Sequence, residues 1–308
     1  MTEIVITEFM DEAVIAQALA GRAVRYDPGL VDRPDELMAL LADARALVVR
    51  NRTQVRGALL AAAPRLKVVG RLGVGLDNID VAACAARGIA VCPANGANDA
   101  SVAEYVVTAA LLLLRGAFLA SERVAAGEWP RMALIGREVA SRRLGLVGYG
   151  AIARETARRA RALGMHIAAF DPHLPTDDPA WAGVERLELG ALLAMSDVVS
   201  LHVPLTDETR NMLDAAAIAA MKPRAVLVNA ARGGVVDEQA LVAALRAGHL
   251  GGAALDVFER EPVDATQGGR FRDVPNLILT PHIAGVTEES NVRVSQVTAE
   301  AVLRHLDT

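Results

Sequence analysis

LGLVGYGAIARE, residues 144–155, carries the strongest indication of the fold of this chain. Its first half is a short apolar run typical of a buried strand. Gly148, Gly150 and Ala153 then form a Gly-x-Gly-x-x-Ala turn that opens a helix rich in alanine and arginine. Glycines at such a turn let the backbone approach a pyrophosphate at the helix N-terminus, and Asp171, about twenty residues later, stands where a carboxylate accepts hydrogen bonds from an adenosine ribose. The stretch therefore predicts a dinucleotide-binding βαβ unit.

The same residues favour NAD as the cofactor. The charge of Asp171 would repel the 2′-phosphate of NADP, although His173 and the nearby arginines leave NADP possible. The alternative is that the glycines only allow close packing of helix on strand. We expect the helix over residues 151–163, with Ile152, Thr156, Ala160 and Leu163 facing the sheet.

On both sides of this turn, strand-like apolar runs alternate with helical stretches. After residue 143 the runs are LGLVG, IAAF, DVVSLHV, AVLVN, GAALDV and NLILT, and before residue 100 they are EIVIT, AVRY, ALVVR, KVVG and IAVC. This alternation predicts a doubly wound parallel sheet of six strands joined to a smaller α/β domain. Residues 101–114 are apolar on nearly every face, so we expect a helix that is buried all round. Residues 116–143 show little regular pattern and are interpreted as an arm reaching a partner subunit.

Composition restricts the function. The 308 residues favour two domains, and 53% hydrophobic residues suffice to bury both cores. With 32 basic and 37 acidic residues the net charge is −5, which argues against nucleic acid or a membrane surface as a partner. The longest apolar run, 105–114, is too short to span a bilayer, and no export signal is visible, so we expect a cytoplasmic protein. No histidine grouping has the spacing of metal ligands.

Three polar residues follow predicted strands in unusual contexts: Arg232 in NAARGGVVDE, Glu261 in ALDVFEREP and His282 in TPHIAG. Ligands of a doubly wound sheet bind beyond the carboxyl ends of its strands, so the three are expected in one crevice. An arginine binds a carboxylate bidentately, a histidine titrates near neutrality, and an adjacent carboxylate fixes the histidine tautomer. The set predicts an enzyme that binds a 2-oxo acid and protonates its carbonyl oxygen. The alternatives are a surface ion pair for Arg232, a structural His282, and Glu259 or Asp264 in place of Glu261.

Ordered motifs along nearly the whole chain resemble the D-isomer-specific 2-hydroxyacid dehydrogenases. They are RNRTQV at 50–55, GRLGVGLDNID at 70–80, GLVGYGAIARE at 145–155, SLHVPLTDETR at 200–210, MKPRAVLVNAARGGVVDE at 221–238 and TPHIAG at 280–285. The resemblance implies a Rossmann domain inserted in a smaller flavodoxin-like domain, an active site in the cleft between them, and a homodimer built on the nucleotide domains. Residues 98–285 are then expected to bind NAD, and 1–97 with 286–308 to form the substrate domain.

The resemblance also implies roles for single residues. Arg232 would bind the substrate carboxylate, His282 would act as acid and base, and Glu261 would support His282. The expected cofactor-binding residues are Gly148, Gly150, Ala151, Ile152, Asp171, Pro204, Thr209, Ala230, Asp256 and Gly285, with Asp256 near the nicotinamide carboxamide. The expected substrate-binding residues are Arg50, Asn51, Gly73, Val74 and Gly75. Many relatives carry a hydroxyl where this chain has Val74, so only backbone amides would meet a carboxylate there.

Together these features predict hydride transfer between NAD(H) and C2 of a small 2-hydroxy or 2-oxo acid. Glu261 argues against formate oxidation, because formate dehydrogenases of this fold carry glutamine at that position. Phosphite oxidation and an NAD-sensing, corepressor-like binding function are the alternatives. Arg50, Arg52 and Arg71 indicate either a basic pocket for a second anion on C3 or arginines that face solvent. Sulfolactate, phosphoglycerate, glycerate and glyoxylate all remain open as substrates.

Overall fold

The computed structural model describes residues 2–307, which form two compact units. Unit 1 combines the residues up to Asn98 with those from Val286 onward, and unit 2 is Asp99–Gly285. Both units are α/β sandwiches around a parallel sheet, so the predicted fold class is confirmed.

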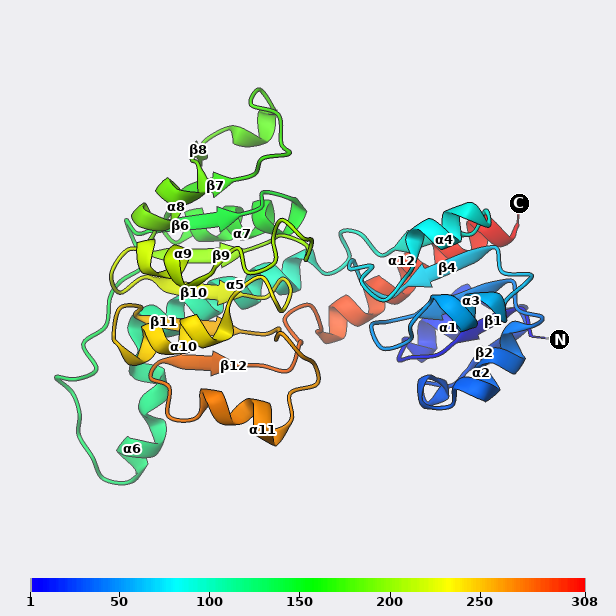
Figure 1. Ribbon diagram of the computed structural model, residues 1–308, viewed down its shortest axis with the longest axis horizontal. Helices are drawn as coiled ribbons and strands as arrows, with labels where there is room; N and C mark the ends of the chain where they lie inside the picture. Colours follow the sequence, from blue (N-terminus) through cyan, green and yellow to red (C-terminus); the bar gives the residue numbers. More distant parts are fainter. Residues whose placement is uncertain (1, 308) are drawn as a thin grey trace. The chain divides into compact units, whose positions relative to one another are not determined.

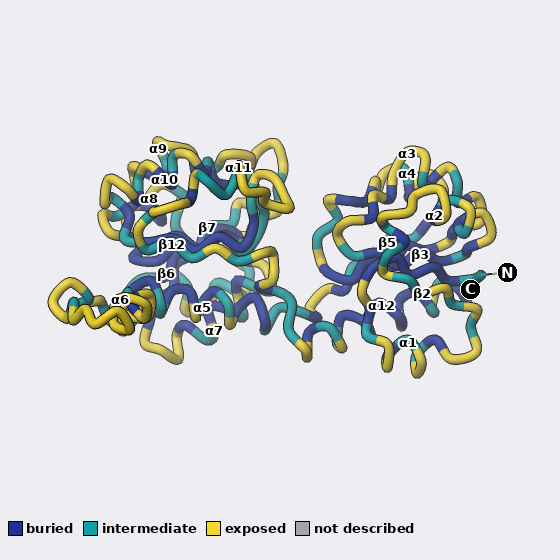
Figure 2. The backbone as a smooth tube through the Cα atoms, turned by 90° about the horizontal axis from the view of Figure 1, so that it is seen from below, coloured by how far each residue is buried: buried dark blue, intermediate teal, exposed yellow. Residues whose placement is uncertain are grey.

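Unit 1 has a five-stranded parallel sheet in the order β2-β1-β3-β4-β5, which is the flavodoxin-type order. Helices α1 and α12 cover one face, while α2, α3 and α4 cover the other (Figures 1 and 2). Its elements are β1 (Ile4–Ile6), α1 (Glu12–Ala18), β2 (Val24–Tyr26), the 3-10 helix η1 (Leu30–Asp32), α2 (Pro34–Leu41), β3 (Ala46–Val49), α3 (Gly57–Ala61), β4 (Val68–Arg71), α4 (Val81–Ala86), β5 (Ala90–Pro93) and α12 (Glu288–Leu306).

Strands β1 and β3 are neighbours, with Ile6 paired to Val48. Since they are parallel, the residues that follow them emerge at the same edge of the sheet. This brings Glu8 beside the segment Arg50–Thr53.

Unit 2 has a seven-stranded parallel sheet in the order β12-β11-β10-β9-β6-β7-β8. Renumbered within the unit, its central strands follow the Rossmann order, and the direction of winding reverses between β6 and β9. Its elements are α5 (Asp99–Arg115), η2 (Ala117–Ala120), α6 (Ser121–Ala125), β6 (Arg143–Val147), α7 (Ala151–Ala162), β7 (His166–Phe170), η3 (Pro179–Trp181), β8 (Glu185–Arg186), α8 (Leu189–Met195), β9 (Val198–Leu201), α9 (Ala215–Ala220), β10 (Val226–Asn229), α10 (Glu238–Arg246), β11 (Gly252–Leu255), α11 (Ala265–Gly268), η4 (Gly269–Phe271) and β12 (Leu277–Leu279).

Two details of unit 2 differ from the sequence-based expectation. The sheet has a seventh strand, β8, which the hydrophobic pattern missed because both of its residues are exposed. Helix α7 ends at Ala162, and Leu163 is 39% exposed rather than facing the sheet. The buried face of α7 consists of Ala153, Thr156, Ala157 and Ala160. These small residues allow α7 to pack closely against α5 (Figure 2).

The apolar composition of helix α5 predicted burial on every side, and this prediction is wrong. Its residues Val106, Ala110 and Leu113 lie in the core with α7 and the sheet, but Glu104 and Thr108 are exposed on the opposite face. Within residues 2–307 no single helix is long and apolar enough to cross a membrane. One bent pair, Asp99–Arg115 with Ala117–Ala125, meets that criterion by length and composition only.

Candidate active site

The glycine-rich turn after β6 has the geometry of a phosphate-binding turn. Gly148 has a φ of 86°, and a Cβ there would lie 2.6 Å from the carbonyl oxygen of His202, so only glycine fits. Gly150 precedes the first turn of α7, and a Cβ added there would meet open space. That open space in front of a helix N-terminus fits a dinucleotide pyrophosphate. Ala151 and Ile152 begin α7 at this point.

Asp171 stabilises this turn from the neighbouring strand. It follows β7, and its Oδ2 accepts a hydrogen bond from the Tyr149 N–H at 2.8 Å. Its Oδ1 accepts the N–H groups of His173 and Leu174 at 2.9 and 3.1 Å. The carboxylate is thus fixed next to the turn, where the adenosine ribose is expected.

The other expected cofactor positions lie on loops that follow β9 and β10. The hydroxyl of Thr209 is buried and donates to the carbonyl oxygen of Pro204 at 2.6 Å, which closes the 204–209 loop. Ala230 packs against the core at the end of β10. Burial lowers the pKa of His202, which follows β9, to about 4, so this histidine is neutral and does not compete as an acid.

Arg232 lies in a turn whose backbone is held by a buried asparagine. Asn229 ends β10, donates from Nδ2 to the carbonyl oxygen of Arg232 at 2.9 Å, and accepts the Ala231 N–H at 3.1 Å. A Cβ on Gly233 would overlap the carbonyl oxygen of Phe258. The glycine therefore permits close contact between the Arg232 turn and the loop that carries Glu261.

His282 and Glu261 form a hydrogen-bonded pair, with 2.7 Å between Nδ1 and Oε2. The Phe258 N–H holds the other oxygen of Glu261 at 2.9 Å. Burial raises the pKa of Glu261, but the hydrogen bond and charge of His282, the Phe258 N–H and the charge of Arg232 together lower it below its ordinary value of 4.5. The ionised carboxylate accepts the Nδ1 proton, and Nε2 is then the nitrogen that can exchange a proton with a substrate.

Glu259 and Asp264, the two other acids near Glu261 in the sequence, have different functions. Glu259 accepts the backbone N–H of Glu238 at 3.3 Å and pairs with Arg270. Asp264 is the N-cap of α11, with a complete capping box. The partner of His282 is therefore Glu261.

The loop that carries His282 is held by a second acid, Asp256, which is 1% exposed. His282 has a φ of 54°, a conformation rare for residues other than glycine, and its N–H donates to the Asp256 carbonyl at 2.8 Å. Oδ1 of Asp256 accepts the Thr280 hydroxyl at 2.6 Å and the Ile283 N–H at 2.8 Å, and Oδ2 accepts the Ala284 N–H at 2.8 Å. Both carboxylate oxygens of Asp256 are thus used to fix the loop that carries His282.

We call this set of hydrogen bonds to Asp256 the Asp256 clamp, and it continues to α5. The hydroxyl of Tyr105 lies 2.7 Å from that of Thr280. Sequence reasoning missed both residues, because neither a tyrosine in an apolar helix nor a threonine after a strand stands out. Gly285 follows the clamped loop at the end of unit 2.

Within unit 1 the three arginines of the suggested basic pocket differ in their surroundings. The guanidinium of Arg50 donates to Asn291 Oδ1 at 2.8 Å and lies 5.8 Å from the centre of the Phe9 ring. Arg52 points outward and pairs with Asp32. Arg71 is buried and donates to the carbonyl oxygen of Leu72 at 2.7 Å. Arg52 is therefore the solvent-facing arginine of the three, and Arg50 is half-buried with a neutral side-chain partner.

The loop that contains Gly73, Val74 and Gly75 lies after β4. Gly73 has a φ of 148°, and Val74 is 37% exposed. Asn51 is exposed at the end of β3. The backbone from Arg50 to Thr53 is bonded to Glu8, a buried acid that sequence reasoning also missed; its position directly after a buried strand is the only signal it gives.

Comparison with known proteins identifies the family. Residues 107–284 match the model of the NAD-binding domain of D-isomer specific 2-hydroxyacid dehydrogenases. The chain is 55% identical to the (S)-sulfolactate dehydrogenase of Chromohalobacter salexigens over 99% of both chains. It is 41% identical to the D-3-phosphoglycerate dehydrogenase of Mycobacterium leprae, over 88% of this chain but only 51% of that longer protein.

A solved structure agrees with these matches. The D-lactate dehydrogenase of Aquifex aeolicus, complexed with NAD and lactic acid, superposes with a TM-score of 0.86 and 29% identity over 99% of this chain and 96% of that one. The sequence motifs, the two folds and these matches agree: the chain belongs to the D-isomer specific 2-hydroxyacid dehydrogenase family.

Proposed function

We propose that this NAD-dependent enzyme interconverts a 2-hydroxy acid and a 2-oxo acid that carry a second anionic group on C3, with sulfolactate and 3-sulfopyruvate as the pair that fits best. The 55% identity to a sulfolactate dehydrogenase over nearly the whole of both chains supports this choice. Arg50 supports it as well. Burial lowers the pKa of Arg50, and its guanidinium has a neutral hydrogen-bond partner in Asn291, so an incoming sulfonate would compensate a half-buried positive charge.

The hydrogen bond between His282 and Glu261 is the observation that carries the chemistry. When bound, NADH supplies the hydride that C2 receives. In the proposed mechanism Nε2 of His282 donates the proton that converts the carbonyl oxygen to a hydroxyl, and oxidation runs in the reverse direction. Glu261 holds the Nδ1 proton and stabilises the imidazolium, while Arg232 binds the substrate carboxylate. Asn51 and the backbone of residues 73–75 contribute further donors to the substrate in this proposal.

Asp171 determines the proposed preference for NAD over NADP. Its carboxylate is held by three backbone N–H groups, so it cannot swing away without breaking the turn at Tyr149. A 2′-phosphate would meet a fixed negative charge. Pro204, Thr209 and Ala230, on the loops after β9 and β10, are proposed to contact the cofactor together with Gly285. Asp256 is 1% exposed and bonded on both oxygens, so its proposed part in the cofactor site is to fix the loop that leads to Gly285.

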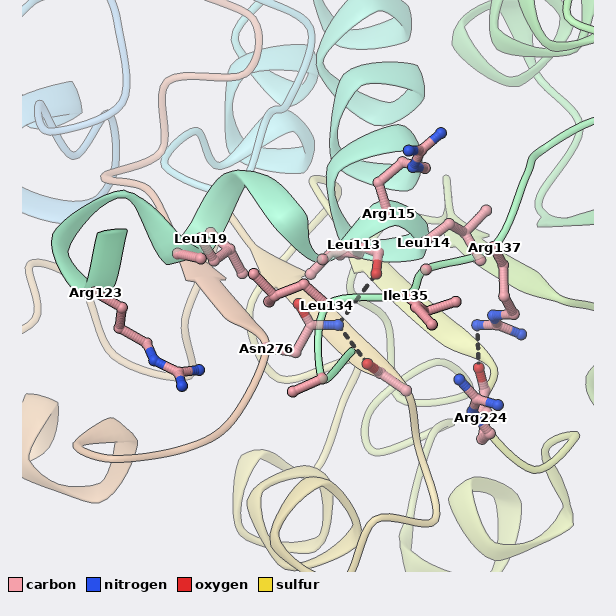
Figure 3. A pocket seen from close by; sticks show the side chains of 15 residues that line it. Leu113, Leu114, Arg115, Leu119, Arg123, Leu134, Ile135, Arg137, Arg224 and Asn276 are labelled. Atoms are coloured by element: carbon pink, nitrogen blue, oxygen red, sulfur yellow. Dashed lines mark hydrogen bonds between the residues drawn. The ribbon is translucent and has the colours of Figure 1, made fainter. Parts of the chain in front are cut away.

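We also propose that the protein works as a homodimer in the cytoplasm, where NAD is available. The segment after α5 exposes large apolar side chains: Phe118 is 66% exposed, Trp129 80%, Met132 78% and Ile135 67%. A hollow of about 340 Å³ lies beside them, with Leu113, Leu119, Leu134 and Ile135 among the residues that line it (Figure 3). Apolar surface of this kind marks a protein interface. Replacing Trp129 and Met132 with lysine should yield monomers by light scattering, and a variant that remains dimeric would contradict this assignment of the interface.

The direct test of function is NADH oxidation by the purified enzyme with a panel of 2-oxo acids, repeated with NADPH. The panel contains 3-sulfopyruvate, 3-phosphohydroxypyruvate, hydroxypyruvate, glyoxylate and pyruvate. We expect the highest kcat/KM for 3-sulfopyruvate and a preference for NADH. A higher value for pyruvate or glyoxylate would refute the proposed C3 anion, and NADH binding without reduction of any 2-oxo acid would refute the reaction itself.

A further inference from the structure

We propose that Glu8 is a positioning residue whose buried carboxylate fixes the segment that presents Arg50 and Asn51 to the substrate. Its Oε1 accepts the backbone N–H groups of Arg50 and Thr53 at 2.9 and 3.0 Å. Its Oε2 accepts those of Asn51 and Arg52 at 3.1 and 3.0 Å. The inference deepens the proposed function, because it rests on Arg50 and Asn51 contacting the substrate.

Four successive N–H groups that converge on one point form an anion-binding concavity of the backbone. Here the chain supplies the anion itself. Glu8 is 5% exposed, so a charged carboxylate without hydrogen-bond partners at this place would be costly. Burial raises the pKa of Glu8, but the hydrogen bonds from Thr53, Arg52 and Arg50 outweigh it, and the net pKa is lowered. The group is therefore ionised at neutral pH and bonded on both oxygens.

The carbonyl side of the same segment is held by another buried residue. Nδ2 of Asn78 donates to the Thr53 carbonyl at 2.7 Å and to the Arg50 carbonyl at 3.3 Å. The hydroxyls of Thr7 and Thr53 lie 2.8 Å apart. With its four N–H groups bonded to Glu8 and its first and last carbonyls bonded to Asn78, the segment has one favoured conformation.

This arrangement also determines what remains available on Arg50. The carboxylate of Glu8 is occupied by backbone donors, whereas the guanidinium of Arg50 bonds Asn291 and lies over the Phe9 ring. Arg52, two residues further on, is paired with Asp32. Glu8 thus orders the loop through backbone hydrogen bonds and leaves the donors of the Arg50 guanidinium to other partners, while its charge raises the pKa of Arg50.

Glu8→Gln tests the inference, since the amide keeps one acceptor oxygen and places a donor against two of the four N–H groups. Glu3→Gln is the matched control. Glu3 directly precedes β1, the strand that Glu8 follows, and its carboxylate pairs with Arg45 at 2.7 Å, away from the 50–53 segment. Both variants replace a carboxylate of unit 1 with an amide, and only Glu8→Gln should loosen the 50–53 segment. Glu8→Asp keeps the charge and should recover part of the activity.

The readout is the ratio of kcat/KM for 3-sulfopyruvate to kcat/KM for glyoxylate. Glyoxylate has no C3 anion and does not need Arg50 in its exact position. We expect Glu8→Gln to lower the ratio roughly ten- to hundredfold, mainly through KM, as for the loss of a hydrogen bond to a charged group. Glu3→Gln should leave the ratio unchanged. An unchanged ratio in Glu8→Gln, or an equal loss in Glu3→Gln, would overturn the proposal.

Amide hydrogen exchange separates this inference from the proposed function. If wild-type enzyme shows no preference for 3-sulfopyruvate, the proposed substrate fails, and the positioning role is then decided by exchange at residues 50–53. We expect roughly tenfold or faster exchange there in Glu8→Gln than in Glu3→Gln. In Glu8→Ala, formate but not chloride should restore slow exchange by refilling the concavity. Exchange that is equal in the two glutamine variants would overturn the positioning role whatever the substrate is.

Discussion

Two loops of this enzyme, the one that carries His282 in unit 2 and the one that carries Arg50 in unit 1, are held in the same way. Each follows a parallel strand, and each is fixed by a buried carboxylate that follows the neighbouring strand. Asp256 after β11 holds the loop after β12, and Glu8 after β1 holds the loop after β3. An acid at the carboxyl end of one strand is thus the natural anchor for the loop that leaves the next strand.

The two clamps differ in what they bind. Glu8 accepts the backbone N–H groups of its loop, so the side chains of that loop remain available. Asp256 accepts two backbone N–H groups and the hydroxyl of Thr280, which in turn contacts Tyr105 on α5. The first clamp fixes the loop that is proposed to bind the substrate. The second ties the loop that carries His282, the proposed acid and base, to the long helix α5. Substitutions in each clamp should therefore separate effects on binding from effects on the chemical step.

The largest effect is expected from removing His282, the proposed acid and base. His282→Ala should lower kcat by roughly a hundred- to ten-thousandfold, the contribution typical of general acid catalysis, while NADH binding measured by fluorescence stays close to wild type. His166→Ala, at an exposed histidine on β7, is the control and should retain full turnover. Near-normal turnover in His282→Ala would show that the clamped loop of unit 2 does not carry the chemistry.

The second largest effect is expected from changing Asp256, whose carboxylate fixes the loop that carries His282. Asp256→Asn places an amide donor against N–H and O–H donors in a site that is 1% exposed, so we expect a loss of about 1–3 kcal/mol in stability and roughly a tenfold or greater fall in kcat. Asp237→Asn is the matched control, because asparagine is as good an N-cap of α10 as aspartate. Thermal unfolding and turnover measured together check the result. Lost stability with unchanged kcat would mean that the clamp has no bearing on proton transfer.

The clamp in unit 1 can be tested through pH. Burial raises the pKa of Glu8, but the hydrogen bonds from the N–H groups of Thr53, Arg52 and Arg50 outweigh that effect, so its folded pKa lies below the ordinary value of 4.5. A group with a depressed pKa stabilises the fold above its unfolded pKa, and this contribution is lost as pH falls through the folded pKa. Wild type should therefore exceed Glu8→Gln in unfolding free energy at neutral pH, and the difference should shrink below pH 4.5. Denaturant titrations across that range measure it, and a difference that does not vary with pH would contradict an ionised Glu8.

The contrast between the clamps also explains what the sequence could predict. Strand ends and glycine turns have strong local patterns, so the Rossmann turn at Gly148 and the strand-end positions of Arg232 and His282 are predictable from the amino-acid sequence alone. The clamps depend on a pairing of strands that are distant in sequence, and a single acid such as Glu8 gives no periodic signal. The prediction for Leu163 is wrong for a related reason, since helical spacing alone does not show that α7 packs against α5.

The smallest effect is expected at the far end of the Asp256 clamp. The Thr280 hydroxyl can donate only one hydrogen bond, and it donates that bond to the Asp256 carboxylate at 2.6 Å. The Tyr105 hydroxyl must therefore donate to the Thr280 oxygen at 2.7 Å. Burial raises the pKa of Tyr105, which keeps that donor protonated. Tyr105→Phe removes one donor but leaves Asp256 fully bonded, so we expect a stability loss of about 0.5–1.5 kcal/mol and a change in kcat of less than about threefold. Tyr26→Phe on β2 is the control for loss of a phenol hydroxyl, with thermal unfolding and turnover as readouts. A fall in kcat as large as that of Asp256→Asn would mean that the hydrogen bond from Tyr105 on α5 determines the position of His282. The clamp of unit 2 would then include Tyr105 and Thr280 as well as the carboxylate of Asp256.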